Sequence, residues 1–222
     1  MTFLALLIPV AVIGLIAWAV VGATRGRSGG EPFTLASATA LYARVLMIAG
    51  AVMGLVGTGI ILKAAFGFIN LAYSYFTPQA GYAPNPVGSV GPLMANSYVE
   101  QQRGQDLVLG ITLLVVGALV AAGHYYLARA VAHMTGGSPA WVTRGVLLAF
   151  TVVTAIAAIW STAVGLNAML SYFIINTTQS QQPWGDSVGL AIAFVPAWVY
   201  AMTRLVRDLR RPHMQAAPAP SA

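Results

Sequence analysis

The chain has 222 residues, of which 58% are hydrophobic and only 7% are charged. A soluble domain ordinarily has about 45–50% apolar and about 25% charged residues, so these charges are too few to cover a soluble enzyme of this size. The formal net charge is +6, and the absence of cysteine excludes disulfides, thiolate metal sites and thiol nucleophiles.

The distribution of apolar residues predicts membrane-spanning helices. A helix needs about 20 mostly apolar residues to cross the hydrocarbon core of a bilayer. Five stretches without charge in their middle meet this requirement: 3–22, 41–62, 107–127, 145–166 and 188–202. The predicted fold class is therefore an all-α, polytopic membrane protein with five transmembrane helices.

The first stretch differs from a secretory signal peptide. No basic residue precedes it, and its positive charge follows at Arg25. A signal peptide has the opposite charge order and a shorter apolar region. We therefore expect a retained anchor with the N-terminus outside, and a cleaved signal peptide is the alternative.

The predicted organisation follows from these spans. Residues 1–24 form an N-terminal transmembrane anchor, and the Gly-rich residues 25–40 form a cytoplasmic linker. A first helical hairpin occupies 41–135, with a long outer loop at 77–105 whose prolines and glycines favour an extended flap that contacts partners. A second hairpin occupies 136–211, and 212–222 form a disordered tail.

The basic residues predict the orientation in the membrane. Lys63 and Arg103 fall on one predicted side of the membrane, and all other basic residues fall on the opposite side or in the tail that follows it. Cytoplasmic loops carry an excess of Lys and Arg, so the side with more basic residues is predicted to be cytoplasmic. We therefore predict an inner (plasma) membrane protein with its N-terminus outside and its C-terminus in the cytoplasm. The residues on the predicted cytoplasmic side are Arg25, Arg27, Arg44, Arg129, Arg144, Arg204, Arg207, Arg210 and Arg211.

The two predicted hairpins resemble each other in sequence. The segments 70–76 (NLAYSYF) and 167–173 (NAMLSYF) are identical at four of seven positions. Asp106 and Asp186 open the second helix of each hairpin, and each is followed two residues later by valine. We predict an internal repeat of two parallel hairpins, and chance similarity between apolar helices is the alternative.

Two short motifs stand out in the first predicted hairpin: the opening Leu41-Tyr42-x-Arg44, and the run from Gly117 to Arg129 that contains His124. Both resemble motifs of a bacterial integral membrane family of unknown function that is built from tandem two-helix repeats. The resemblance covers about residues 36–210 and implies the fold but no activity. The chain departs from the family pattern before His124, where a proline–aromatic pair is often found.

Lys63 is the first candidate for a functional site. The helical rise from Arg44 to Lys63 is about 28 Å, close to the hydrocarbon thickness of about 30 Å. Lys63 would therefore lie at the outer boundary, where it can extend to the interface or pair with Glu100, Asp106 or Asp186. Such a cluster could gate a pathway or bind an anion. Asp106 and Asp186 also precede apolar runs, so we expect each to cap a helix N-terminus.

Small residues and a histidine are candidates for helix packing. Gly50 and Gly54 form a GxxxG pattern, which allows close helix contact in lipid. We expect this face to pack on the predicted helix 145–166 or on a partner subunit. His124 lies inside a predicted span, where we expect a packing or interfacial role, and haem or pigment ligation is the alternative.

Further candidates lie beyond the outer ends of two predicted spans. Asn70 with Ser74, and Asn167 with Ser171, are four residues apart, so each pair shares a helix face. They could hydrogen-bond between the two hairpins, and a ligand groove is the alternative. Aromatic residues that include Phe66 predict a belt at the outer interface.

The sequence contains no phosphate loop, metal-ligand spacing or Ser-His-Asp pattern. We therefore predict no enzymatic activity, no cofactor or metal, and no nucleic-acid partner. The predicted function is a structural or accessory role in the lipid bilayer, as a subunit or homo-oligomer that packs through small-residue helix faces. The alternatives are a small transporter or channel and a haem- or pigment-binding electron-transfer subunit.

Overall fold

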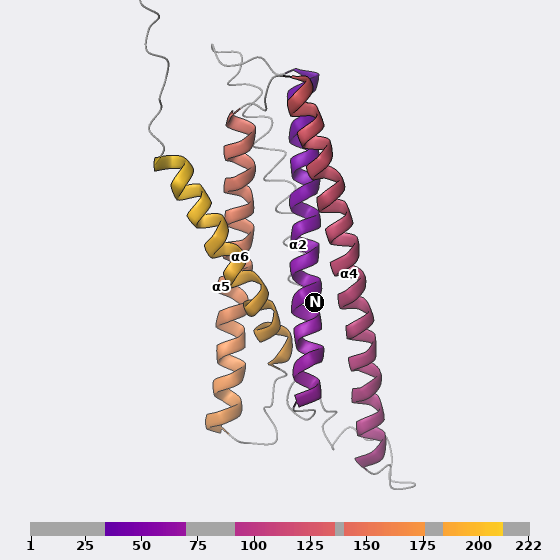
Figure 1. The fold of residues 1–222 in the computed structure, drawn as a ribbon. Helices are drawn as coiled ribbons and strands as arrows, with labels where there is room; N and C mark the ends of the chain where they lie inside the picture. The colour runs from indigo at the N-terminus through magenta and orange to yellow at the C-terminus, as the bar shows by residue number, and fades with distance from the viewer. Residues whose placement is uncertain (1–33, 70–91, 136–139, 176–183, 211–222) are drawn as a thin grey trace, which may run out of the picture.

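The computed structural model describes residues 34–69, 92–135, 140–175 and 184–210. All regular secondary structure in these residues is α-helical, which confirms the all-α class. Figure 1 shows the helices, and the predicted span at 3–22 lies outside the described residues. The helices are α2 (Leu35–Ile69), α4 (Pro92–Met134), α5 (Ala140–Ile175) and α6 (Gly185–Arg210).

All four helices are long and apolar enough to cross a membrane. They contain 35, 43, 36 and 26 residues. At 1.5 Å per residue even the shortest, α6, is about 39 Å long, against a hydrocarbon thickness of about 30 Å. Each helix contains one of the last four predicted spans and extends beyond it at both ends. The excess length requires the helices to tilt or to project from the hydrocarbon core.

The start of α2 differs from the prediction. Residues 25–40 were expected to form a linker, but α2 begins at Leu35. A reciprocal cap stabilises this start: the Ser37 N–H donates to Thr34 Oγ1 at 3.2 Å, and the Thr34 N–H donates to Ser37 Oγ at 2.9 Å. Two backbone donors that have no partner within the helix are thereby satisfied, which explains the early start.

The start of α4 also differs. The helix begins at Pro92, so residues 92–105 are helical and not part of the predicted outer loop 77–105. Proline is favoured at the first helical position, where no N–H is needed. Asp106 consequently lies inside α4, and the prediction that it caps a helix was wrong. Asp186 lies in the first turn of α6, but its carboxylate contacts Lys63, and its predicted capping of this helix stays a prediction.

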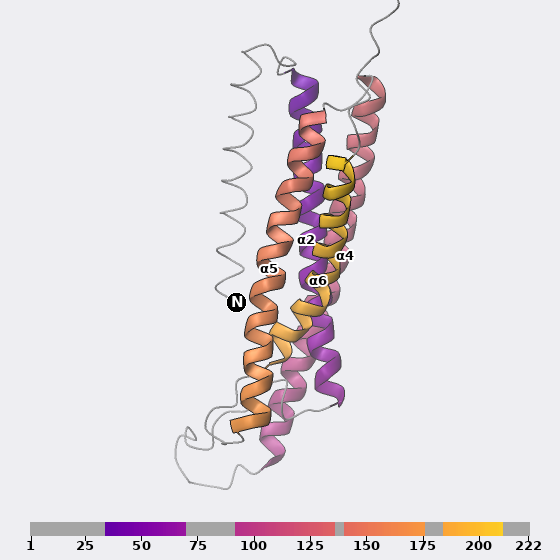
Figure 2. The same ribbon diagram turned by 90° about the vertical axis from the view of Figure 1, so that its left-hand side faces the viewer.

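The helices are arranged around α2, which contacts the other three. Figures 1 and 2 show α2 and α4 side by side and antiparallel along most of their length. α5 packs chiefly on α6, so each helix of a predicted hairpin has the other as a main neighbour. The side-chain core between α2, α5 and α6 centres on Ala158, Ala193 and Phe194.

Small residues recur every seven positions on the face of α2 that contacts α4. They are Ala43, Gly50, Gly57 and Ala64, and all are buried. A Cβ atom on Gly50 would lie 2.7 Å from the carbonyl oxygen of Gly117. A Cβ atom on Gly57 would lie 2.6 Å from the carbonyl oxygen of Gly110, which like Gly117 belongs to α4. We call these contacts the glycine seam.

The glycine seam decides which helix packs on the GxxxG face. Gly50 and Gly54 contact α4 through Gly117 and not α5, so the expected packing on the helix at 145–166 was wrong. A second close contact joins α2 to α6, because a Cβ on Gly59 would lie 3.1 Å from the backbone nitrogen of Leu190. Glycines therefore bring two neighbours into backbone contact with α2.

Substitution of Gly117 by alanine tests the glycine seam. Its Cβ would lie 2.6 Å from the carbonyl oxygen of Gly50 and from the backbone nitrogen of Gly54, and these backbone atoms cannot rotate away. We expect Gly117→Ala to lower the free energy of unfolding by about 1–3 kcal/mol. Unfolding of the purified protein in detergent, followed by circular dichroism, measures this loss.

Gly123→Ala is the matched control, because Gly123 lies on the same helix and its Cβ would meet no atom within 4 Å. Alanine is favoured over glycine inside a helix by about 0.5–1 kcal/mol, so this variant should be equally or slightly more stable. Equal stability of the two variants would contradict the close α2–α4 contact.

Candidate functional site

Lys63 joins three helices through two ion pairs. Its Nζ atom lies 2.9 Å from Asp106 Oδ2 of α4 and 2.9 Å from Asp186 Oδ1 of α6. The side chains of Lys63 and Asp106 are 13% and 17% exposed, whereas Asp186 is 53% exposed. We call these three residues the Lys63 cluster. The structure thus brings together the charged residues that the sequence predicted as partners, and Glu100 lies exposed on α4.

The glycine contacts place the short aspartates within reach of Lys63. Asp106 and Gly110 are four residues apart, so they lie on one face of α4. Gly110 contacts Gly57 of α2, and this face is therefore turned toward α2. Gly189 follows Asp186 by three residues, and its Cβ would lie 3.2 Å from the backbone nitrogen of Lys63. Aspartate has a short side chain, so these backbone contacts allow both carboxylates to reach one ammonium.

The burial of Asp106 makes this cluster important for stability. Its Oδ2 atom is buried and has no aligned hydrogen bond among the described residues, so the ammonium is the group that compensates its charge. A buried carboxylate without a partner costs several kcal/mol. Asp186 gains further stabilisation from the positive N-terminal end of α6. Because two carboxylates already neutralise Lys63, the arrangement disfavours binding of a further anion.

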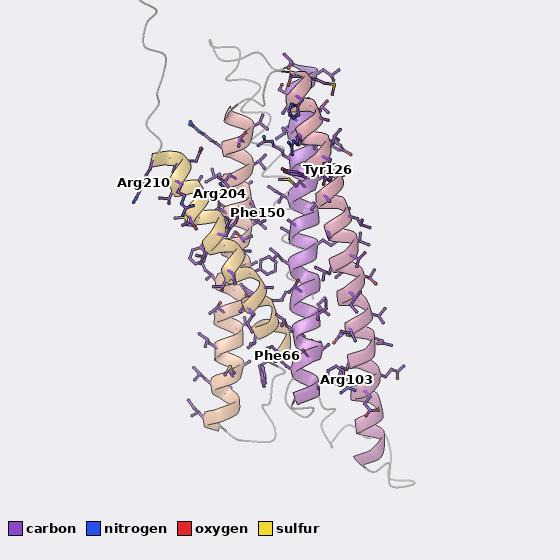
Figure 3. The ribbon with its side chains drawn as sticks, in the orientation of Figure 1. Phe66, Arg103, Tyr126, Phe150, Arg204 and Arg210 are labelled. Atoms are coloured by element: carbon purple, nitrogen blue, oxygen red, sulfur yellow. The ribbon has the colours of Figure 1, made fainter. Side chains whose placement is uncertain are left out.

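Aromatic side chains surround this end of the bundle. The guanidinium of Arg103 lies 3.9 Å from the centre of the Phe68 ring, and the rings of Phe66 and Trp184 are 5.6 Å apart. Figure 3 shows Phe66 and Arg103 toward the same end. These contacts link α2 to α4 and to the start of α6. The other predicted aromatic residues beyond Ile69 lie outside the described residues.

Arginines gather at the opposite end of the bundle. Arg144 of α5 lies 3.2 Å from Asp208 of α6, and both side chains are partly exposed. The Nε of Arg204 donates a hydrogen bond to the Tyr200 hydroxyl at 3.1 Å. Figure 3 shows Arg204 and Arg210 at this end. The sequence had placed these arginines on one membrane side, but it did not predict which helices would bring them together.

His124 lies between α4 and α2. Its Nδ1 is 2.8 Å from the carbonyl oxygen of Val120, and its ring meets the Tyr42 ring edge to face at 5.9 Å. Nδ1 therefore donates to the helix backbone. The ring contact with Tyr42 supports the packing role, whereas the hydrogen bond to Val120 fixes the tautomer and is compatible with either role.

The predicted Asn–Ser pairs are only partly described. Asn70 and Ser74 lie outside the described residues, so hydrogen bonding between the two pairs stays a prediction. Asn167 and Ser171 share α5, where Asn167 is exposed and Ser171 is half-buried. Neither contributes to the Lys63 cluster.

Several hydroxyl groups inside the bundle donate hydrogen bonds to carbonyl oxygens of their own helices. Thr151 and Thr154 donate to the carbonyl oxygens of Leu147 and Phe150, each at 2.8 Å. Ser161 donates to Ala158 at 3.2 Å, and Thr58 of α2 likewise donates within its own helix. The donors of these hydroxyls are therefore used within their own helices, and toward the rest of the bundle these groups can act only as acceptors.

Comparison of the chain with protein-family models, curated proteins and solved structures finds no match. The resemblance to a tandem-repeat membrane family therefore stays a prediction that rests on two short motifs.

Substitution of Lys63 by methionine tests the cluster. The change keeps an unbranched side chain but leaves the buried Asp106 carboxylate without its counter-charge. We expect a loss of about 3–5 kcal/mol in the free energy of unfolding. The double variant Lys63→Met with Asp106→Asn should recover part of this loss, since it removes the buried charge. Detergent unfolding of the single and double variants measures both effects.

Arg144→Gln is the matched control for Lys63→Met, because the Arg144–Asp208 pair is much more exposed. An exposed ion pair contributes less than about 1 kcal/mol. If Lys63→Met were as stable as this control, the cluster would have no role in holding the helices together.

Proposed function

We propose that this chain is a multi-pass integral membrane protein with a structural or accessory role. The observation that carries the proposal is the Lys63 cluster, in which one lysine on α2 holds aspartates of α4 and α6 at 2.9 Å. Together with the glycine seam it favours a rigid helical scaffold. The Lys63 ammonium is paired with two carboxylates, and the cluster contains no histidine.

The apolar outer surface supports residence in a bilayer and association there. α4 contacts α2 along one face, while its other faces carry exposed large side chains such as Val108 and Leu119, which are 66% and 68% exposed. In water such a surface would be strongly unfavourable, whereas lipid or another helix can cover it. We therefore place the chain in the inner membrane as a subunit or homo-oligomer.

The face used for association is proposed on α4. The small residues Gly50 and Gly54 of α2 already pack against α4 of the same chain, so they are not exposed to a partner subunit. Ala118 and Ala122 are small, exposed residues on α4, four residues apart. Small residues at this spacing let two helices approach closely in lipid.

The proposed topology has five spans, with the N-terminus outside and the C-terminus in the cytoplasm. The described helices place Arg44, Arg144, Arg204 and Arg207 toward one end and the Lys63 cluster toward the other. An excess of Lys and Arg marks the cytoplasmic side. The pairing of α2 with α4 and of α5 with α6 supports the proposed tandem hairpins, although the repeat rests on the sequence.

A transporter or channel is the rival function. The hydroxyls of Thr151, Thr154 and Ser161 bond to their own helix, which leaves few polar groups for a solute path. Flux through reconstituted liposomes would support this rival, and its absence over a broad solute panel would weaken it. A visible absorption spectrum tests the haem- or pigment-binding alternative for His124.

Single-cysteine crosslinking tests the association face. The natural chain has no cysteine, so a cysteine introduced at Ala118 is the sole thiol. We expect oxidation in native membranes to give a disulfide-linked dimer of Ala118→Cys. Ala163→Cys is the control, because Ala163 is an exposed alanine on α5. Equal crosslinking of the two variants, or none with Ala118→Cys in a chain that purifies as a monomer without partners, would contradict the proposal.

Reporter fusions test the proposed topology. We expect a fluorescent protein fused after residue 222 to be active, since this reporter fails to fold when exported through the general secretory pathway. Alkaline phosphatase, which requires export, should be inactive at the same position. The reverse pattern would place the arginine-rich end outside and contradict the proposed orientation.

A further inference from the structure

A groove opens between α2, α5 and α6 at the end opposite the Lys63 cluster. Gly59 and Gly189 hold α2 and α6 together near that cluster, and Figure 1 shows α6 leaning away from α2 toward its C-terminal end. The groove has a volume of about 390 Å³. Ligand sites commonly have volumes of about 300–1,000 Å³, so this groove is large enough for a headgroup and part of an attached chain.

The groove has a positively charged rim. Three arginines line it, Arg44 from α2 and Arg204 and Arg207 from α6. Asp208 is the acidic residue of the lining, and its carboxylate is already engaged by Arg144 at 3.2 Å. Within the described part of the chain, Arg44 and Arg207 have no ion pair or hydrogen bond through their side chains. Their charges are therefore available to a ligand.

Tyr200 contributes to the arrangement of the rim. Its hydroxyl accepts the Nε–H of Arg204 at 3.1 Å, and its ring lies 5.6 Å from the same guanidinium. A guanidinium has five N–H donors, so Arg204 keeps four for another acceptor. Planar arginine groups bind phosphate oxygens with paired hydrogen bonds.

The remainder of the groove is mainly apolar. Ile48 and Val146 are buried beside it, and Leu147 and Phe150 of α5 complete this part of the lining. Figure 3 shows Phe150 nearer the middle of the bundle than Arg210. A charged rim above an apolar wall matches a ligand that has an anionic head and a hydrocarbon chain.

The depth of the rim matches the membrane interface. Arg44 lies about 28 Å along α2 from Lys63, and Arg204 lies about 27 Å along α6 from Asp186. Both separations are close to the hydrocarbon thickness of about 30 Å. If the Lys63 cluster lies at one hydrocarbon boundary, the arginines lie at the other, at the level of lipid phosphates.

From these features we infer that the groove binds an anionic phospholipid of the surrounding leaflet. Its phosphate is held by Arg44, Arg204 and Arg207, and an acyl chain lies along Val146 and Phe150. Basic pockets between membrane helices bind anionic lipid headgroups in this way. The inference rests on the proposed residence in a bilayer but not on the proposed association through α4.

Native mass spectrometry of the full chain in mild detergent tests this inference. Phosphatidylglycerol and phosphatidylcholine with the same acyl chains are titrated separately. We expect tighter retention of phosphatidylglycerol, and we expect Arg44→Gln to weaken it about tenfold, as for the loss of one charge-assisted hydrogen bond. Arg204→Gln should weaken retention similarly, and because Arg204 is exposed we expect this variant to fold normally. Circular dichroism verifies the fold of each variant.

Arg210→Gln is the matched control, because it removes the same charge from an exposed position of α6 outside the groove. Equal weakening by Arg210→Gln would show attraction by net charge alone and overturn the inference. Equal retention of the two lipids, or unchanged binding to Arg44→Gln, would also overturn it. Displacement of phosphatidylglycerol by inorganic phosphate would identify a site for free anions instead. These outcomes do not depend on the crosslinking of Ala118→Cys, so the two proposals can fail separately.

Discussion

The close backbone approach of α2 to its neighbours is the constraint on which the rest of this structure depends. Gly50 and Gly57 admit α4 on one face, and Gly59 admits α6 on another. No side chain fits at these points, since an added Cβ would overlap backbone atoms of the neighbouring helix. In lipid there is no hydrophobic driving force between helices, because the lipid chains are as apolar as the side chains. Van der Waals contact of this kind is therefore a main source of helix association.

Both charged ends of the bundle follow from this approach. Near the glycine contacts the helices are close enough for two short aspartates to reach Lys63, where one ammonium pairs with two carboxylates. Farther along α6 the helices separate, so the guanidinium groups of Arg44 and Arg207 remain available around a groove. The same divergence therefore gives one end where acidic residues are paired with a lysine and another end with excess positive charge.

The distribution of polar groups connects the fold with the proposed role. Buried hydroxyls of α5 are satisfied by carbonyl oxygens of their own helix, and the outer faces are apolar. A bundle built in this way carries its charged side chains at its two ends and not along its axis. That pattern favours a scaffold that contacts lipid and partner helices over a solute pathway.

The sequence by itself determined the all-α class, four of the helices that can cross a membrane, and the residue types at each end, because hydropathy and helical rise are local properties. It also indicated Asp106 and Asp186 as partners of Lys63. Local patterns did not locate the starts of α2 and α4, where a reciprocal cap and a proline extend the helices. Only the tertiary structure decided that Gly50 contacts α4 and that Arg44 and Arg204 line one groove, because a sequence pattern defines a helix face but not the helix that will contact it.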